Sequence, residues 1–303
     1  ILGFLLSLII ITIVAMFFLN TRRIFEIFSK INYLYFSLAL LFQVTAVLFA
    51  GLALYLLTKG CVKLSSLLPL HYTGYLLADL TPGKSGYLAI AFFTEKPLDI
   101  FSGIMVMQAL SLLVRITAFI LLFFYFSLTL EVVHSIAFSS FMIVFIAVGM
   151  IILVKDNLWE KVSWLIPEKF KPKIEALRNS LKNVGNYRKA LLLVFLSWPP
   201  TALRWFFVFQ SINVLVDPIA ILLLHPIVYV VAFTPITPGG FGLTETVGLA
   251  FQPFLGVSSE ELFSSLLIDR VVEILASLPF FLLFIIRYGG EFWNVIRSAT
   301  MLQ

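Results

Sequence analysis

Eight ionisable side chains lie inside strongly apolar stretches of this chain, where their chemistry is the binding of charge. They are four cations and four anions: Lys84, Arg115, Arg204, Arg270, Asp79, Glu245, Asp269 and Glu273. A charge at the centre of a bilayer costs roughly 2.5–3.5 kcal/mol even on lenient insertion scales. Equal numbers of cations and anions therefore indicate ion pairing or a hydrated cavity.

The arginines are the strongest candidates for binding an anionic ligand. Guanidinium matches phosphate oxygens with two parallel hydrogen bonds and keeps its charge when buried. We therefore interpret Arg115 and Arg270 as phosphate ligands and Lys84 as a supporting cation, with Glu245 and Asp269 balancing the charge. The alternative is structural: Arg115, Arg270, Glu245 and Asp269 would form ion pairs between the halves of the protein. Both interpretations fit the residue types.

Two similar motifs bring backbone breaks close to these charges. Thr81-Pro82-Gly83-Lys84-Ser85-Gly86 returns 156 residues later as Thr237-Pro238-Gly239-Gly240-Phe241-Gly242. Proline removes a donor and glycine favours turns, so neither motif continues a helix. A helix that begins after each break would point free N–H groups and its positive dipole end at an anion. We therefore add the backbone of these residues to the predicted binding site: Gly83, Gly86, Pro238, Gly239, Gly240 and Gly242.

The spacing of the charged residues and of the histidines allows two further predictions, one about helix capping and one about metal binding. Glu245 falls in the first turn after the second break, where a carboxylate caps a helix, and Arg270 and Glu273 lie one turn apart on one face. His71 and His225 lack partners at ligand spacing, so we predict no metal site. No catalytic motif appears, and we predict neither a cofactor nor enzyme activity.

The elements that must position these residues follow from composition. The chain has 303 residues, of which 61% are hydrophobic and only 12% are charged. Soluble domains carry about 25% charged residues, so we predict an integral membrane protein. The long apolar runs favour helices over the alternating pattern of barrel strands. The single cysteine, Cys61, excludes an internal disulfide framework.

Six apolar segments are long enough to cross a bilayer, and two others are interrupted. The six predicted spans are 1–19, 33–58, 98–126, 134–154, 190–212 and 261–288. Segments 61–95 and 217–255 contain the breaks; the apolar run after the first break rises only about 12 Å as a helix, against a hydrocarbon core of about 30 Å. We predict that both interrupted segments are re-entrant helical hairpins.

The order of these segments predicts two inverted repeats, 1–126 and 134–288. Three crossings per repeat is an odd number, so the second copy must run opposite to the first. A basic cytoplasmic linker, 155–189, would carry nine Lys or Arg against four Asp or Glu, whereas 213–260 has no Lys or Arg. By the positive-inside rule, both termini would be cytoplasmic, and 289–303 would form an interfacial tail. The short 20–32 loop would then face outside despite Arg22, Arg23 and Lys30.

A known family shows the same pattern. The stretch from Pro238 to Glu245, followed by Asp269-Arg270, resembles the lysylphosphatidylglycerol synthase transmembrane, flippase-like family. That family includes the membrane half of the bacterial multiple-peptide-resistance factor and related archaeal and bacterial membrane proteins. The resemblance covers roughly 30–288 and implies that a lipid is moved between leaflets. Bifunctional relatives carry a soluble aminoacyl-transferase domain after the membrane part; here the sequence ends at Gln303, so no synthase activity is expected.

The prediction is an all-α polytopic membrane protein of the plasma membrane that acts as a lipid flippase or scramblase. Its substrate would be an anionic phospholipid, an aminoacyl-phospholipid or a polyprenyl-phosphate-linked lipid. The alternatives are a secondary transporter of a small anion and a membrane-embedded transferase acting on lipid phosphate. The expected partners are membrane lipids, with no nucleic acid, and the prediction leaves room for a homo-oligomer.

Overall fold

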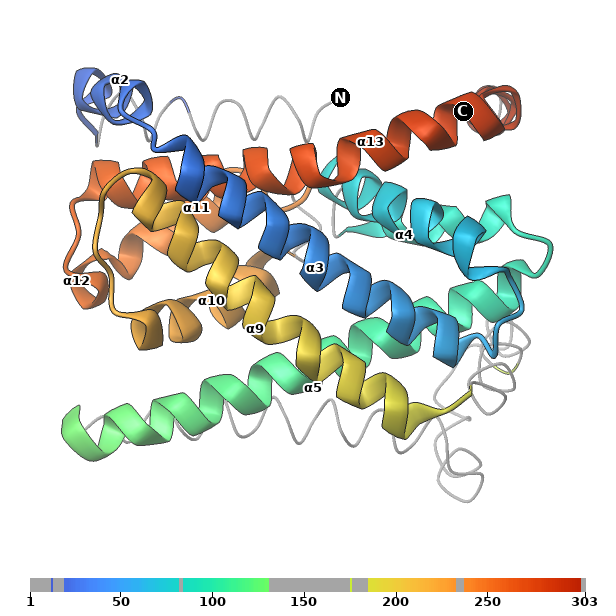
Figure 1. The fold of residues 1–303 in the computed structure, drawn as a ribbon, viewed down its shortest axis with the longest axis horizontal. Helices are drawn as coiled ribbons and strands as arrows, with labels where there is room; N and C mark the ends of the chain where they lie inside the picture. The colour runs from blue at the N-terminus through green and yellow to red at the C-terminus, as the bar shows by residue number, and fades with distance from the viewer. Residues whose placement is uncertain are drawn as a thin grey trace.

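The computed structural model describes residues 12, 19–81, 84–130, 175, 185–232 and 237–300 as an all-helical protein (Figure 1). Other parts of the chain, including the predicted spans 1–19 and 134–154 and most of the linker 155–189, lie outside the described residues. The elements in chain order are α2 (Thr21–Ser29), α3 (Tyr33–Leu57), α4 (Leu64–Asp79), the 3-10 helix η1 (Ser85–Phe93), α5 (Pro97–Leu130), α9 (Tyr187–Ser211), α10 (Pro218–Ala232), α11 (Leu243–Ala250), α12 (Gln252–Leu255) and α13 (Ser259–Thr300).

Four of the described helices contain segments long and apolar enough to cross a membrane. They lie at Tyr33–Leu57, Pro97–Arg115, Tyr187–Ser211 and Ser259–Gly290. They match four of the six predicted spans, because unbroken apolar runs of this length favour helices. Up to Thr300, the predicted tail 289–303 is part of helix α13, because α13 continues through Gly289 and Gly290 without interruption.

Each predicted hairpin segment consists of a longer helix, a break and a shorter helix. In the first, α4 is followed by η1, whose preceding residue Lys84 adopts the left-handed conformation with φ 55°. In the second, α10 is followed by α11, preceded by Gly242 with φ 84°. At about 1.5 Å per residue, the 16-residue α4 rises about 24 Å and the 8-residue α11 about 12 Å. Both are shorter than a hydrocarbon core of about 30 Å.

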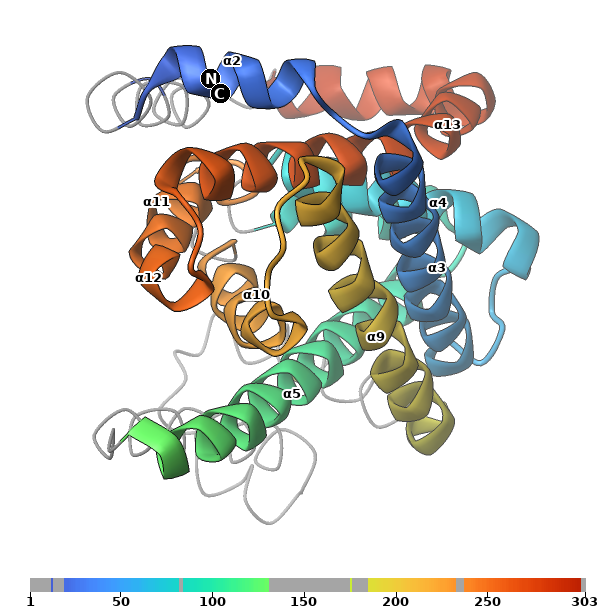
Figure 2. The ribbon, with the colours of Figure 1, turned by 60° about the vertical axis from the view of Figure 1, so that its left-hand side comes forward.

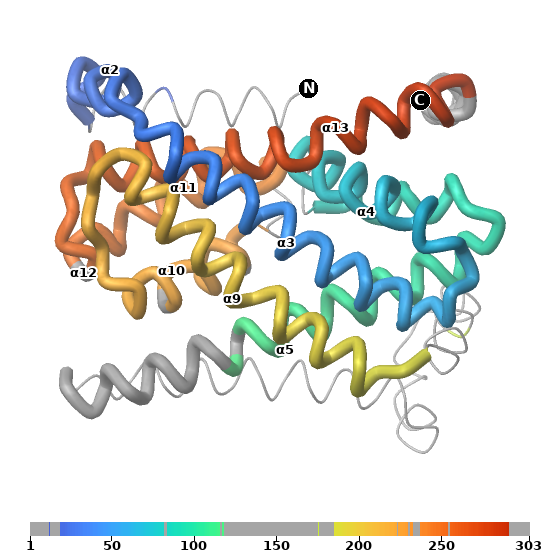
Figure 3. Tube along the Cα trace, in the orientation of Figure 1, coloured from blue at the N-terminus to red at the C-terminus, as the bar shows by residue number. Residues whose placement is uncertain are grey.

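The two halves of the chain pack against each other reciprocally. Helices α3 and α9, which occupy equivalent places in the two predicted repeats, pack along each other and run side by side in Figure 2. Helix α4 of the first half packs against α13 of the second, and the two run close together in the tube trace (Figure 3). Helix α10 of the second half packs against α5 of the first. Each broken segment is therefore held by the last helix of the other half.

The first pair of helices is tied to α3 through a buried histidine. His71 Nε2 lies 3.1 Å from the carbonyl oxygen of Val47, and its Nδ1 is hydrogen-bonded to the Tyr87 hydroxyl. Tyr72 donates from its hydroxyl to the carbonyl of Val44 at 2.7 Å. These contacts satisfy polar groups that would be costly to bury alone, so His71 holds α3, α4 and η1 in one arrangement.

The prediction of a loop at 20–32 is wrong, because residues 21–29 form helix α2. The Asn20 side chain accepts a hydrogen bond from the Arg23 amide at 3.3 Å and so caps the helix. Ile24 is buried beside Phe263 of α13. Arg23 forms an exposed ion pair with Glu261 at 3.5 Å. The positive charge of segment 20–32 did not fit the positive-inside rule. It is partly balanced here by acidic residues in the first turn of α13.

Candidate functional site

The two backbone breaks touch each other. The amide of Gly239 donates to the carbonyl of Thr81 at 3.0 Å. A Cβ on Gly239 would lie 2.7 Å from the carbonyl oxygen of Asp79, and Gly239 has φ +54°. Only glycine permits both this conformation and this close approach. Pro238 is buried beside it, whereas Gly83 lies outside the described residues.

The glycine amides at the helix starts are not free to bind an anion, contrary to the expectation from the sequence. The amide of Gly86 donates to Thr81 Oγ1 at 2.6 Å, and that of Gly242 donates to Glu245 Oε2 at 2.6 Å. The amide of Gly240 donates to the carbonyl of Thr237 at 3.2 Å. Nearby side chains and turn carbonyls accept from these amides, because each acceptor lies only a few residues away in the chain. The predicted capping role of Glu245 is confirmed by the same contact.

Arg270 is held by carboxylates from both broken segments. Its Nε lies 3.4 Å from Glu245 Oε1, and its Nη1 lies 3.5 Å from Glu273 Oε2 and 3.8 Å from Asp79 Oδ1. Its Nη2 donates to the Gly239 carbonyl at 3.0 Å and to Thr244 Oγ1 at 2.7 Å. This is the geometry of the structural alternative, in which the arginine joins the two halves by ion pairs.

Arg204 forms the second half of this network, and the sequence did not place it in the predicted site. Its Nε lies 2.9 Å from Asp269 Oδ1, and its Nη1 lies 2.8 Å from Glu273 Oε1. The same Nη1 donates to Gln43 Oε1 of α3 at 2.7 Å. Glu273 therefore bridges Arg204 and Arg270. The sequence did contain a signal for this contact, since Arg204 and Gln43 are polar residues in the middle of apolar helices.

Arg115 differs from the other two arginines, since among the described residues it forms no ion pair. Its guanidinium carbon lies 3.6 Å from the ring centroid of Tyr229, close enough for a cation–π contact. Its Nε is buried without a hydrogen-bond partner. Tyr229 belongs to α10 and donates from its hydroxyl to Gln108 Oε1 of α5 at 2.9 Å. Tyr229 thus holds α10 against α5 and carries Arg115 on its ring.

Lys84 approaches the same tyrosine. Its Nζ lies 5.6 Å from the centroid of the Tyr229 ring and 3.5 Å from Asp79 Oδ1. Lys84 thus contacts one carboxylate, which it shares with Arg270, whereas Arg270 contacts three. Lys84 and Arg115 are therefore the less compensated cations of this centre.

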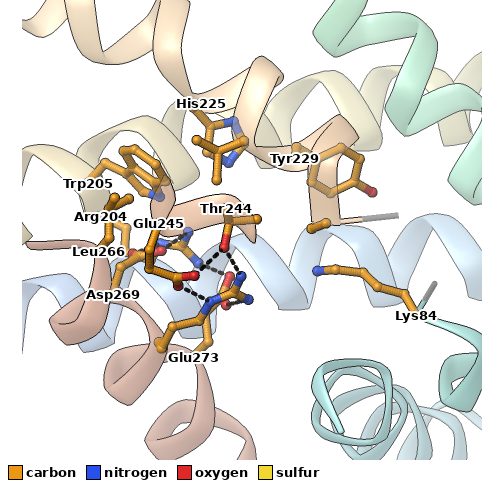
Figure 4. A pocket seen from close by; sticks show the side chains of 13 residues that line it. Lys84, Arg204, Trp205, His225, Tyr229, Thr244, Glu245, Leu266, Asp269 and Glu273 are labelled. Carbon is orange, nitrogen blue, oxygen red and sulfur yellow. Dashed lines mark hydrogen bonds and ion pairs between the residues drawn. The ribbon is translucent and has the colours of Figure 1, made fainter. Parts of the chain in front are cut away.

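A cavity of about 30 Å³ lies between these groups (Figure 4). This volume has room for about two water molecules. The figure shows Trp205 and His225 near one another, Lys84 and Tyr229 on another side, and the Arg204, Glu245 and Glu273 network below. The residues that line the cavity include Lys84, Arg204, Trp205, His225, Tyr229, Thr244, Glu245, Asp269, Arg270 and Glu273. The cavity therefore has a polar wall at the contact of the two breaks.

The histidines take separate positions in this arrangement. His71 lies in the α3–α4–η1 contact, and His225 lies on the cavity wall with its ring edge-on to Trp205. Within the described part of the chain, no three His, Cys, Asp or Glu side chains are placed to hold a metal ion.

The apolar helices and the buried charged centre define a polytopic helical membrane protein. The chain belongs to the family described as the lysylphosphatidylglycerol synthase TM region, whose model matches residues 1–298. The family predicted from the Pro238–Glu245 stretch is therefore confirmed. No curated protein and no solved structure matches the chain. Family membership indicates a lipid-related function in a membrane.

Proposed function

We propose that the protein moves a lipid with an anionic headgroup between the leaflets of the plasma membrane. The observation that carries the proposal is the state of Arg115. It is a cation without an ion pair among the described residues, and it lies on the ring of Tyr229, which lines a polar cavity. An unpaired cation at this depth is costly unless an anion or water compensates it. A phosphate group that enters from the bilayer would supply that anion.

The reciprocal packing of the two halves supports transport. Each broken segment packs against the last helix of the other half, and the breaks meet at Thr81 and Gly239. Transporters built from inverted repeats place their substrate sites at such interrupted helices. We propose that α4–η1 and α10–α11 are re-entrant hairpins that enter from opposite faces, with both termini cytoplasmic. The polar headgroup would pass between them while the hydrocarbon chains remain in the bilayer.

The cations have different roles in this proposal. Arg115 and Lys84 would contact the phosphate, because Arg115 lacks an ion pair and Lys84 shares only Asp79. Arg270 and Arg204 would hold α13 against the hairpins through their carboxylates. Movement of a headgroup would therefore require α5 and α10 to separate near Tyr229, while the ion pairs of Arg204 and Arg270 stay intact.

Transport in proteoliposomes tests this function. Purified protein is reconstituted with a trace of acyl-chain-labelled phosphatidylglycerol, and a membrane-impermeant quencher reports the fraction of label that reaches the outer leaflet. Arg115→Gln should slow transfer about tenfold or more, since a charge-assisted contact is worth roughly 1.5–3 kcal/mol. The matched control is Arg287→Gln, which removes an exposed arginine of α13 that stacks on Tyr288. Transfer no faster than in protein-free vesicles would refute the function.

A second candidate is a secondary transporter of a small anion, and the size of the cavity favours it. A space of about 30 Å³ admits water rather than a complete lipid headgroup. Uptake of labelled inorganic phosphate into the same vesicles, without transfer of lipid, would identify this function. Mass spectrometry of the lipids after incubation would detect a transferase, because that activity changes the lipid itself.

A further inference from the structure

Helices α5 and α10 meet through polar contacts of a different kind from those that join their neighbours. Ion pairs link α9 to α13, and α13 to both α4 and α11. Within the described part of the chain, neither α5 nor α10 takes part in an ion pair, and the Tyr229 hydroxyl of α10 donates to Gln108 Oε1 of α5 at 2.9 Å. Breaking a neutral hydrogen bond costs less than leaving a buried charge uncompensated. The α5–α10 interface is therefore easier to open than the ion-paired contacts.

The beginning of α5 is fixed, so an opening of this interface would start near Gln108. Ile104 and Met107 are completely buried in the core of the first half. Gly103 lets α5 approach the end of α3 closely, since an added Cβ would lie 2.6 Å from Thr58 Cγ2. Gln108, one residue after Met107, is only partly buried. The packed part of α5 thus ends where its hydrogen bond to α10 begins.

The ring of Tyr229 also positions two cations. The guanidinium carbon of Arg115 lies 3.6 Å from the ring centroid, and Lys84 Nζ lies 5.6 Å from it. Stacking on an aromatic ring uses the face of a guanidinium and leaves the N–H groups at its edge, which match phosphate oxygens. Arg115 Nε is buried without a hydrogen-bond partner. Tyr229 therefore holds Arg115 with a donor still available for an anion.

The closed arrangement leaves too little space for a headgroup behind Tyr229. The cavity lined by Tyr229 and Lys84 measures about 30 Å³ (Figure 4), which has room for about two water molecules. A lipid phosphate can reach these cations only after the surrounding helices move apart. The α5–α10 interface is the contact beside them that no ion pair holds closed within the described residues.

We propose that the α5–α10 interface is the entrance through which the phosphate headgroup of a bilayer lipid reaches the centre, and that Tyr229 controls it. The proposal rests on the proposed function and identifies its entry path. The bond from the Tyr229 hydroxyl to Gln108 keeps the interface closed, and its breaking limits the rate of transfer. The Tyr229 ring is a positioning group, which holds Arg115 in place to receive the phosphate.

Two variants remove the bond that closes the interface. Tyr229→Phe loses the hydroxyl and keeps the ring on which Arg115 stacks. In proteoliposomes containing acyl-labelled phosphatidylglycerol, its maximal transfer rate should rise about fivefold, the rate equivalent of one net hydrogen bond. Gln108→Leu removes the same bond from α5 and should give the same rise, and the double variant should be no faster than either single variant. The control is Tyr72→Phe, which loses a hydroxyl bond of 2.7 Å to the Val44 carbonyl between α4 and α3 and should keep the wild-type rate.

The variant Tyr229→Leu tests the positioning role of the ring. Compared with Tyr229→Phe, it should raise the mole fraction of phosphatidylglycerol that half-saturates transfer at least about threefold, because the cation–π contact with Arg115 is lost. Tyr229→Phe should keep the wild-type half-saturating fraction while its maximal rate rises. A general loss of packing would lower the rate in both variants and would not separate rate from half-saturation.

A cross-link across the interface tests whether it must open. Gln108→Cys and Tyr229→Cys are combined with Cys61→Ser, which removes the single native cysteine. Joining the two thiols with a short, cleavable bifunctional reagent should stop transfer, and cleaving the reagent should restore it. The control pair is Phe42→Cys with Phe207→Cys, whose native rings stack between α3 and α9 with centroids 5.4 Å apart. Its cross-link should leave the transfer rate unchanged.

The outcomes separate this inference from the function on which it rests. Unchanged transfer in the cross-linked α5–α10 pair, or no acceleration in Tyr229→Phe and Gln108→Leu, would overturn the entrance while lipid transfer by the wild-type protein stands. Equal acceleration in Tyr72→Phe would overturn it as well, because the effect would then be general loosening. No transfer by the wild-type protein would refute the function itself, and uptake of labelled inorganic phosphate alone would overturn a lipid as the guest. If Tyr229→Phe does not fold, Gln108→Leu decides the question.

Discussion

Gly239 and Thr81 are joined by a hydrogen bond of 3.0 Å from the amide of the first to the carbonyl of the second, although they lie 158 positions apart in the chain. The contact joins the break after α4 to the break after α10. Because Gly239 also lies against the Asp79 backbone, movement of one segment must disturb the other. Any transport that opens the centre therefore involves both halves.

Gly239→Ala should destabilise the protein by about 2–4 kcal/mol. The new Cβ would meet the Asp79 carbonyl oxygen at 2.7 Å, and the residue would keep φ +54°; strain of this conformation alone costs of order 1–3 kcal/mol. Thermal unfolding in detergent, followed by tryptophan fluorescence, measures the loss. Gly256→Ala is the control, since Gly256 has φ +65° but nothing within 4 Å of a built Cβ. Equal losses in both variants would show that the close approach has no effect.

Removing one member of the Arg204–Asp269 pair should cost about 3–5 kcal/mol, because it leaves a buried charge uncompensated. Arg204→Met and Asp269→Leu are expected to be strongly destabilised singly. The double variant should lose less than the sum of the two, with a coupling of about 0.5–3 kcal/mol. The shared partner Glu273, 2.8 Å from Arg204, keeps the recovery incomplete. Additive losses would contradict a direct interaction.

Arg115→Gln and Arg270→Gln should differ in stability. Loss of Arg115 removes a cation–π contact worth about 0.5–2 kcal/mol, whereas loss of Arg270 leaves Glu245 buried without its cation, at about 3–5 kcal/mol. Unfolding midpoints of the two variants in the same detergent measure the difference. A larger loss for Arg115→Gln would mean that Arg115 is the structural arginine, and the assignment of phosphate contacts would be reversed.

Thr81→Val should destabilise the first break by about 1–3 kcal/mol, the cost of an unsatisfied buried donor. Thr81 Oγ1 accepts from the Gly86 amide at 2.6 Å and donates to the Leu77 carbonyl at 2.9 Å. Hydrogen exchange of the Gly86 amide, measured by mass spectrometry, should accelerate. Thr45→Val serves as the control, because within the described part of the chain the Thr45 hydroxyl bonds only to the Leu41 carbonyl, inside α3. Unchanged exchange in Thr81→Val would exclude the cap.

The order of apolar runs and breaks along the chain was enough to predict the helices in its described part, with the exception of α2. An uninterrupted run such as 33–57 favours a helix in an apolar surrounding, because every backbone group must be satisfied within the segment. The breaks were visible as Pro-Gly motifs. The cap formed by Glu245 and the Arg270–Glu273 contact depend on spacings of three residues, which a helix alone determines.

The partners across the centre were decided by tertiary structure alone. Asp269 and Arg270 are adjacent in sequence, yet successive residues of a helix point in different directions, so Asp269 pairs with Arg204 while Arg270 faces Glu245. Helix α2 likewise depends on Asn20 and on contact with α13 rather than on a long apolar run.

The sequence by itself determined the membrane class, the family, the described helices other than α2, and the identity of the buried charges. Whether each charge is neutralised or remains available was settled only when α5, α9, α10 and α13 came together. Arg115 and Arg270 have the same chemistry and similar places after their breaks, and their surroundings alone distinguish them: the aromatic face of Tyr229 for one, and three carboxylates for the other. The physical reason is that ion pairing depends on distances between side chains far apart in the chain, which the linear order of residues does not specify.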